Sequence, residues 1–550
     1  MPLSAQQELN WRFAVTGAVA GIPASDPAGT VYVLTDDNSL HAIKPYSGSL
    51  IWTYRANEAL TETLLVGPDY TVYVFTKRNR LLAITPGGTV RWKRRFNSSL
   101  SHNPATSPDG SILLPLMDGR LIKISGRGQV LWEKNMVLSL TSPIVDEDGL
   151  IYVSGADSIL YCYSQIGNIK WQYQLEKSSS QTALWKESVI VVSDDGIAMS
   201  LNNNGDLNWK NRKMPNGIKP VSIVTTANSV KVLYDKGEIV ELSTEGIIEG
   251  VFKGPPTSGY ASVDENGALY IYGKNKKLFK YYSNDITEMI TETKMTPPLI
   301  GAAGNLVSGG ENWIVYSFIS PSSAPGWSGY RGGPMRNGAV KPTNGIKRLK
   351  KYYRDFRGYQ YYKLMSESPE LENRLNILDD FENLFTEGDL INKYPFAPLI
   401  LLSMAEEGIS RSIYDQTGHS TSSSLVRIKA INLLGKIGDI RMRNFLISHL
   451  NQENSPSAVI STIWALSRIG FDYDGASIRS IVRVKDRFYN DDGVLLTICD
   501  AIEEIIYYNG IVTDQSGLHA LLSIYGSDAP PNTRKRAKSI FENFTRGRSF

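Results

Sequence analysis

Two groups of residues in this sequence are of types that could do chemistry. The first is the acidic run VDEDGLIYV (residues 145–153), whose closely spaced carboxylates are of the kind that hold a cation. The second is the pair of cysteines, Cys162 and Cys499. The five histidines add to neither group, because none stands at metal-ligand spacing from another His or Cys.

A structural explanation accounts for both groups more simply. The acidic run has an Asp-Gly turn between two apolar stretches, as do SPDGS from Ser107 and VDENGALYI from Val263. Cys162 stands alone in an alternating stretch, YCYSQ, where a small buried side chain is expected. The sequence contains no Gly-x-Ser-x-Gly elbow or phosphate-binding loop. We therefore predict no catalytic, cofactor-binding or metal-binding residues and no enzyme activity.

The elements that would have to position these residues repeat along the chain. A strand, a turn with glycine and a tryptophan four residues later recur at steps of 38 to 41 residues, as in LHAIKPYSGSLIWTYRA from Leu40. The glycines are Gly48, Gly88, Gly128, Gly167, Gly205 and Gly246. The tryptophans are Trp11, Trp52, Trp92, Trp132, Trp171 and Trp209. We expect each glycine to allow a left-handed turn and each tryptophan to wedge between neighbouring repeats.

Later copies of the repeat are degenerate. Gly250 stands where the sixth copy would have its tryptophan, and the seventh aligns Asp285 with the glycine and Met289 with the tryptophan. These departures predict a weaker sector of the assembly, where we would look first for a partner.

Each repeat contains about four short strand signals separated by turn residues, which is typical of a β-propeller blade. Trp11 lies 41 residues before Trp52 and has no inner strands ahead of it, while residues 296–320 supply inner strands without an outer one. A ring of eight blades, closed by the N-terminal strand, is therefore expected. Seven blades with a stray terminal strand is the alternative.

The repeat LHAIKPYSGSLIWTYRA resembles the tryptophan-docking repeat of quinoprotein (PQQ-type) propellers. WSGYRGGPMRNGAV (residues 327–340) is similar to an element that borders non-enzymatic members of that superfamily, and the resemblance covers roughly residues 5–340. A PQQ enzyme of this kind would carry adjacent cysteines over the quinone and a Glu/Asn/Asp set for calcium. This chain has no adjacent cysteines, so a PQQ- and calcium-dependent oxidoreductase is the disfavoured alternative.

Beyond residue 342 the apolar period becomes helical. VRIKAINLLGKIGD (residues 426–439) resembles a HEAT repeat, and SAVISTIWALSRIGFD (residues 457–472) is a second copy. Gly438, Gly470 and Gly510 are expected to end three helices as left-handed caps. The resemblance implies a HEAT-like α-solenoid over residues 417–550. Residues 341–416 are expected to form a helical connector or atypical capping repeats, after a propeller over residues 1–340.

Three further segments have alternative interpretations. Residues 345–364 interleave Lys and Arg with Tyr, and we favour a linker helix whose tyrosines pack on the propeller over a nucleic-acid or membrane surface. Residues 533–550 are expected to form a terminal capping helix, with a docking peptide as the alternative. At the domain junction, Trp327 and Tyr330 are expected to pack against the propeller rim. The other interpretation has Arg331 and Arg336 contact a partner.

Composition limits the possible partners. The net charge is +3 over 550 residues, so no overall field favours nucleic acid. The sequence has no apolar run long enough to span a membrane and no signal peptide as given, so peripheral or lipid-anchored membrane association stays open. The resemblance extends to the lipoprotein subunit of the outer-membrane β-barrel assembly machinery and implies a periplasmic or cell-envelope protein, although composition alone leaves the cytoplasm open. We expect a non-catalytic scaffold or adaptor of a bacterial envelope that binds other proteins.

Overall fold

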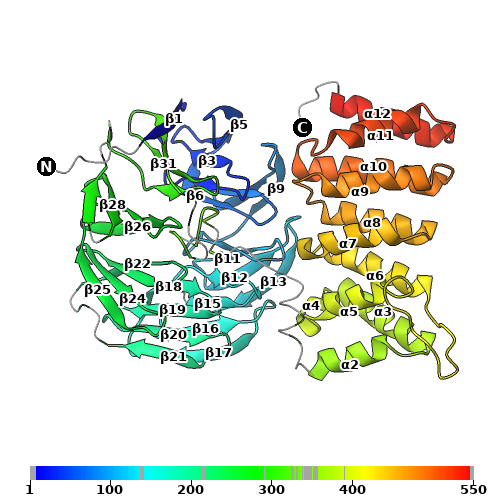
Figure 1. Cartoon of the computed structure of the whole chain (residues 1–550), viewed down its shortest axis with the longest axis horizontal. Coiled ribbons are helices and arrows are strands. Elements are labelled where there is room, and N and C mark those ends of the chain that lie inside the picture. Colours follow the sequence, from blue (N-terminus) through cyan, green and yellow to red (C-terminus); the bar gives the residue numbers. More distant parts are fainter. Residues whose placement is uncertain are drawn as a thin grey trace. The chain divides into compact units, whose positions relative to one another are not determined.

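The computed structural model describes residues 8–136, 141–212, 215, 218–283, 285–289, 291, 293–321, 323, 327–329, 332–336, 338–339, 350, 353, 357–388 and 390–545. The chain divides into two compact units, one of residues 1–84 and 92–342 and the other of residues 85–91 and 343–550. The first unit is built of strands and the second of helices (Figure 1).

The first unit is an eight-bladed β-propeller, in which the described strands form eight four-stranded sheets. Blade 1 contains β2 (Ala24–Ser25), β3 (Val31–Leu34), β4 (Ser39–Ile43) and β5 (Leu50–Arg55), and blade 2 contains β6 (Leu60–Val66), β7 (Val72–Thr76), β8 (Arg80–Ile84) and β9 (Val90–Arg95). Blade 3 contains β10 (Ala105–Thr106), β11 (Ile112–Pro115), β12 (Arg120–Ile124) and β13 (Val130–Asn135), and blade 4 contains β14 (Ile144–Val145), β15 (Ile151–Ser154), β16 (Ile159–Tyr163) and β17 (Ile169–Gln174). Blade 5 contains β18 (Ser179–Trp185), β19 (Ser188–Ser193), β20 (Ala198–Asn202) and β21 (Leu207–Asn211), and blade 6 contains β22 (Pro220–Thr225), β23 (Val230–Tyr234), β24 (Glu238–Leu242) and β25 (Ile248–Lys253). Blade 7 contains β26 (Thr257–Val263), β27 (Leu269–Gly273), β28 (Leu278–Tyr282) and β29 (Asp285–Glu288).

Blade 8 joins the two ends of the propeller sequence. Its strands are β30 (Leu299–Ile300), β31 (Asn305–Gly309), β32 (Ile314–Ile319) and, as the outer strand, β1 (Leu9–Ala14). β1 pairs antiparallel with β32, with Phe13 opposite Val315. The prediction of eight blades closed by the N-terminal strand is confirmed, and the seven-blade alternative is wrong.

The hydrophobic core of the propeller lies between blades. In β7, Val72 and Val74 pack into a cluster shared with blade 1, whereas Tyr73 and Phe75 pack into a cluster shared with blade 3. Because successive side chains of a strand point to opposite faces, one alternating strand contributes to two clusters. The apolar alternation in the sequence therefore stacks each blade against both of its neighbours.

The described elements of the second unit beyond residue 343 are all helical. Its elements are α2 (Arg357–Ser366), α3 (Leu371–Thr386), α4 (Leu390–Lys393), α5 (Ala397–Ala405), α6 (Ser424–Ile437), the 3-10 helix η1 (Ile440–Met442), α7 (Arg443–Gln452), α8 (Pro456–Ile469), α9 (Ala476–Arg487), α10 (Asp492–Asn509), α11 (Gln515–Tyr525) and α12 (Pro531–Thr545). No helix in this described part of the chain is both long and apolar enough to cross a bilayer.

The helices stack in two layers. α6, α8, α10 and α12 contact one another in succession, and α7, α9 and α11 form the second row. The predicted left-handed caps are confirmed at Gly438 and Gly510, where φ is 69° and 68°. Gly470 also ends its helix with a positive φ of 74°, but its ψ of −30° lies outside the left-handed helical region. Residues of α3 and α5 share one hydrophobic cluster with the later helices, so the helices that precede residue 417 belong to the same core.

Candidate functional site: the blade contacts and the propeller axis

Outer-strand tryptophans lie against the turn glycine of the following blade. A Cβ atom on Gly48 would come within 2.7 Å of Trp11, and one on Gly128 within 2.9 Å of Trp92. The same relation holds for the pairs Trp132–Gly167, Trp171–Gly205 and Trp209–Gly246. All six turn glycines have a positive φ, between 64° and 89°. At the five positions paired above, glycine is required for two reasons: the backbone is left-handed, and an indole ring fills the space of a side chain.

The indole N–H groups complete this contact. Nε1 of Trp11 donates to the carbonyl of Pro45 at 2.6 Å, and Nε1 of Trp132 donates to Gln165 at 2.9 Å. The corresponding bonds of Trp92 and Trp171 end on Gly126 and Asn203, at 2.8 and 3.0 Å. Each acceptor lies two or three residues before the turn glycine. Tryptophan and glycine, which recur together within one repeat, thus meet across the boundary between two repeats.

The contact between blades 6 and 7 is filled without a tryptophan. A Cβ on Gly250 would lie 2.4 Å from the ring of Phe252, which folds back over the glycine. The Phe252 ring lies 5.2 Å from the ring of Tyr281 of blade 7, within the cluster that joins the two blades. The space left by the missing tryptophan is therefore filled by Phe252, two positions further along the strand.

The alignment of the seventh repeat was wrong. Asp285 is the first residue of β29 and pairs with Tyr282, and the positive φ of 50° belongs to Ser283. Met289 donates its N–H to Leu278, at the opposite end of β28 from where the other blades place their tryptophan. Its side chain is buried between blades 7 and 8 with Met295. The turn is shorter than in the other blades, which shifts the register of the outer strand.

The described residues between 323 and 339, here called the axial strap, run along the innermost strands. The carbonyl of Trp327 accepts from Thr225 at 2.8 Å, and that of Ser328 accepts from Val263 at 2.7 Å. Three more carbonyls, those of Pro334, Met335 and Gly338, accept from Ser25, Val66 and Val145 at 2.8, 2.9 and 2.8 Å. Every donor is the last residue of an inner strand. Because inner strands line the central channel of a propeller, the strap occupies that channel.

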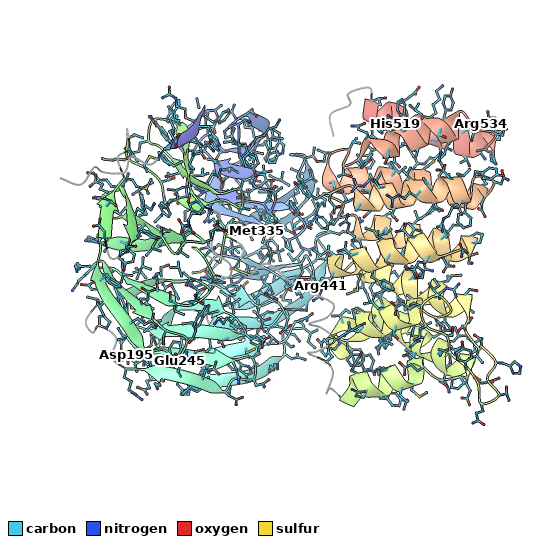
Figure 2. The ribbon with its side chains drawn as sticks, viewed as in Figure 1. Asp195, Glu245, Met335, Arg441, His519 and Arg534 are labelled. Carbon is cyan, nitrogen blue, oxygen red and sulfur yellow. The ribbon has the colours of Figure 1, made fainter. Side chains whose placement is uncertain are left out.

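The strap changes the interpretation of the junction residues. Trp327 is buried and lies at the axis instead of the rim, where its N–H donates to Thr225 Oγ1 at 3.1 Å. Arg336 is 6 % exposed and donates from Nη1 to the carbonyl of Ile22, so it points inward. Figure 2 shows the neighbouring Met335 among the inner strands of the ring. Tyr330 and Arg331 lie outside the described residues.

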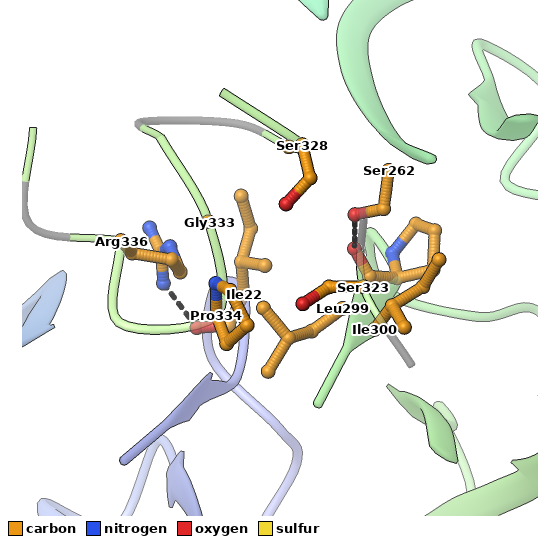
Figure 3. A pocket seen from close by; sticks show the side chains of 11 residues that line it. Ile22, Ser262, Leu299, Ile300, Ser323, Ser328, Gly333, Pro334 and Arg336 are labelled. Carbon is orange, nitrogen blue, oxygen red and sulfur yellow. Dashed lines mark hydrogen bonds between the residues drawn. The ribbon is translucent and has the colours of Figure 1, made fainter. Parts of the chain in front are cut away.

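A small cavity remains beside the strap (Figure 3). It is lined by Ile22, Ile300, Ser262, Ser328 and Arg336, among others, and has room for about one water molecule. A quinone cofactor has far more atoms than this cavity can admit. This cavity therefore does not fit such a group.

The acidic run forms the predicted turn. Gly149 has a φ of 81°, and the Asp146 carboxylate accepts from the N–H groups of Asp148 and Leu150 and from the Tyr152 hydroxyl. Burial, together with the nearby Asp148 carboxylate, raises the pKa of Asp146 to about 7. Gly110 and Gly267, in the two related runs, also have positive φ. Across the described residues no three His, Cys, Asp or Glu side chains come together as a metal site.

The two cysteines are free thiols in different units. Cys162 and Cys499 are both fully buried. Burial raises the pKa of the Cys162 thiol, and raises that of Cys499 to about 12. A buried thiol that stays protonated is a poor nucleophile and metal ligand. Neither cysteine can form the adjacent pair that the quinone chemistry of the resemblance requires.

In the helical unit, arginine and aspartate side chains connect successive helix pairs. Arg443 of α7 donates to Asp472, which lies just before α9, at 2.7 Å, and Arg479 of α9 donates to Asp514, before α11, at 2.6 Å. Asp472 also accepts from the N–H of Ser477 at the start of α9. An arginine–aspartate pair thus joins α7 to the start of α9, and a second one joins α9 to the start of α11. The sequence search for helical apolar periods missed this connection.

The aromatic residues after the junction pack within the helical unit. Tyr362 of α2 lies 5.3 Å from the Phe381 ring and 5.7 Å from the Phe396 ring, and Tyr359 also contacts Phe396. The expectation that these tyrosines pack on the propeller is therefore wrong for α2. They contribute to the helical core instead, because α3 and α5 supply aromatic partners in the same cluster.

Comparison with known proteins gives one family and several similar folds. The model of a family described as "Outer membrane protein assembly factor BamB" matches residues 3–136 and 77–233. No curated protein matches the sequence significantly.

Three solved structures of similar fold are BamB from Moraxella catarrhalis, Sqt1 from Saccharomyces cerevisiae and the computationally designed protein Ika8. Their identities to this chain are 12, 11 and 13 %, and their TM-scores are 0.46, 0.49 and 0.49. Each match covers 57 % of this chain and 99 to 100 % of the other. A likeness of this degree says nothing about function. Residues 3–233 of the eight-bladed propeller are therefore similar to the repeats that this family model describes.

Proposed function

We propose that this protein is a non-catalytic interaction scaffold or adaptor of the bacterial cell envelope, in which propeller and helical array each offer a surface to partner proteins. The observation that carries the proposal is the axial strap. In this chain the strap's own carbonyls satisfy the last N–H groups of five inner strands. A channel filled in this way leaves the outer faces and loops of the ring for binding.

The helical unit supports the same function. Its two-layered stack, connected by the pairs Arg443–Asp472 and Arg479–Asp514, is of the kind that HEAT-like solenoids form, and extended stacks of this kind generally bind proteins. We take the HEAT-like assignment as part of the proposal. The family match supports a location in the periplasm or envelope, and a role close to outer-membrane assembly is the most specific form of the proposal.

Affinity purification from an envelope fraction tests the scaffold function. The full chain should recover a partner in a stoichiometric amount, and a variant without residues 345–550 should lose part of that binding. Recovery of no partner by either protein would contradict the proposal. Cell fractionation tests the location separately, since the protein should be found with the periplasm or membranes.

The alternative function, a PQQ- and calcium-dependent oxidoreductase, is tested directly. Purified full chain is mixed with PQQ and Ca²⁺, and quinone absorbance and dye reduction are followed. The filled channel and the separated cysteines predict neither a bound chromophore nor turnover. Clear turnover would overturn the non-catalytic proposal.

A further inference from the structure

The axial strap crosses the place where the propeller ring is closed. The ring has one seam, where β1 from the start of the chain pairs with β32 from the end of the propeller. The strap follows β32 in the sequence, yet its bonds reach blades on both sides of this seam. Trp327 and Ser328 bind blades 6 and 7, whereas Pro334 and Met335 bind blades 1 and 2.

Side chains strengthen this crossing. Met335 is 9 % exposed and packs in the cluster that joins blades 1 and 2. Nη1 of Arg336 donates to the carbonyl of Ile22, which lies just before the first strand of blade 1. Gly338 and Ala339 continue to blade 4, where Ala339 packs in the cluster shared by blades 3 and 4. On the far side of the seam, both hydrogen bonds and hydrophobic packing therefore hold the strap to the blades.

The backbone of the strap is shaped for this path. Gly332 has a φ of 108°, and a Cβ there would lie 2.8 Å from the carbonyl oxygen of Ala339. Arg336 takes a left-handed φ of 53° although it is buried and not glycine. Residues are held in such conformations only where the surrounding contacts determine them. The contacts at the axis are thus strong enough to hold an unfavourable backbone.

From these contacts we infer that the strap is a second closure of the propeller ring, independent of the β1–β32 pairing. When β1 separates from β32, the strap still holds blades 6 and 7 to blades 1 and 2. When the strap leaves the channel, β1 still completes blade 8. The ring opens at its seam only when both closures are released, so each protects the ring against loss of the other.

A cycle of variants in the full-length protein tests this inference. Trp11→Ala weakens the first closure, because Trp11 of β1 packs in one hydrophobic cluster with Val315 of β32 and with residues of blade 1. Gly332→Val weakens the second. Gly267→Val is the matched control, since Gly267 also has a positive φ, 83°, but nothing lies within 4 Å of its Cβ position. The rate of propeller unfolding in urea is followed by tryptophan fluorescence.

Two independent closures predict a synergistic effect. The double variant Trp11→Ala/Gly332→Val should unfold faster than the product of the two single effects by roughly tenfold, a coupling of the size seen between interacting sites. Trp11→Ala/Gly267→Val should match its product within about twofold. If the strap double variant also matches its product, the inference is wrong.

Hydrogen exchange of the unmodified protein provides a test that needs no variant. At moderate urea concentration, the amides of β1, such as Phe13, should exchange while those of Ser25, Val66 and Thr225 stay protected by the strap. Exchange of both groups at one common rate would mean a single closure and would overturn the inference. The measurement is informative even if a strap variant does not fold.

Discussion

The contact between a tryptophan and the next blade's glycine makes a sharp prediction for Gly246→Ala. The substituted Cβ would lie 2.3 Å from Cε3 and 2.4 Å from Cδ2 of Trp209, a distance at which the ring or the turn must move. Two destabilising effects are expected. An alanine in a left-handed conformation costs roughly 1–2 kcal/mol, and crowding a packed contact costs about 1–3 kcal/mol more.

Gly267→Ala separates the two effects. Gly267 has a φ of 83°, close to the 73° of Gly246, but its Cβ would contact nothing within 4 Å. It should therefore lose only the roughly 1–2 kcal/mol of backbone conformation. The difference between the two variants measures the contact with the indole ring alone.

Unfolding of the full chain in urea, followed by tryptophan fluorescence, is a suitable assay. Nine of the ten tryptophans stand before residue 342, so the signal reports mainly the propeller. In a Trp209→Ala background the ring is absent, and Gly246→Ala should then cost no more than Gly267→Ala. Equal losses for both glycine variants in the original background would refute the contact, and so would a difference that persists without Trp209.

Three further predictions concern charged groups. The pKa of Asp146 is raised to about 7 from an ordinary 3.8, so the contribution of Asp146 to stability is present at low pH and is lost as the pH rises toward 7. Thermal unfolding of Asp146→Asn should therefore depend less on pH between 3.8 and 7 than that of the original protein, and an unchanged pH dependence would contradict this. Burial lowers the pKa of His41 below its ordinary 6.5, so stability should fall as the pH drops below about 6.5, and His41→Gln should remove that loss, as measured by the same scans between pH 8 and 5. In the helical unit, Arg443→Ala leaves the buried Asp472 carboxylate without its cation and should cost about 3–5 kcal/mol. Arg479→Ala should cost much less, because the Arg479 side chain is 45 % exposed and solvent screens its pair with Asp514. Circular dichroism in urea measures both losses, and equal losses would mean that burial does not set the strength of these pairs.

The strap at the axis also bears on the chemistry that this propeller could host. The repeats build the same kind of ring, and the chemistry of such a ring is decided by what occupies its axis. Here the axis holds residues that follow the last blade, and the free space beside Arg336 suits one water molecule. In the proposed scaffold, partner proteins would therefore bind the outer loops and edges of the ring.

Much of the architecture was predictable from the sequence alone. The period of 38 to 41 residues, the alternating strands and the turn glycines specify blades, and the incomplete repeats at both ends specify eight of them with β1 as closure. The glycine caps of α6, α8 and α10 were also predictable. These features are local, since backbone conformation and apolar periodicity are set by residues close in the sequence.

The tertiary structure alone decided which residues meet. The sequence shows Trp132 and Gly167 in successive repeats, but only the ring places the indole ring against that glycine. Phe252 replaces the missing tryptophan of blade 6 from a position two residues along the strand, which no alignment of repeats would choose. Trp327 was predicted at the rim and lies at the axis, because the place of the strap depends on inner-strand N–H groups from five separate blades. Such contacts join residues far apart in the chain, so no local pattern in the sequence records them.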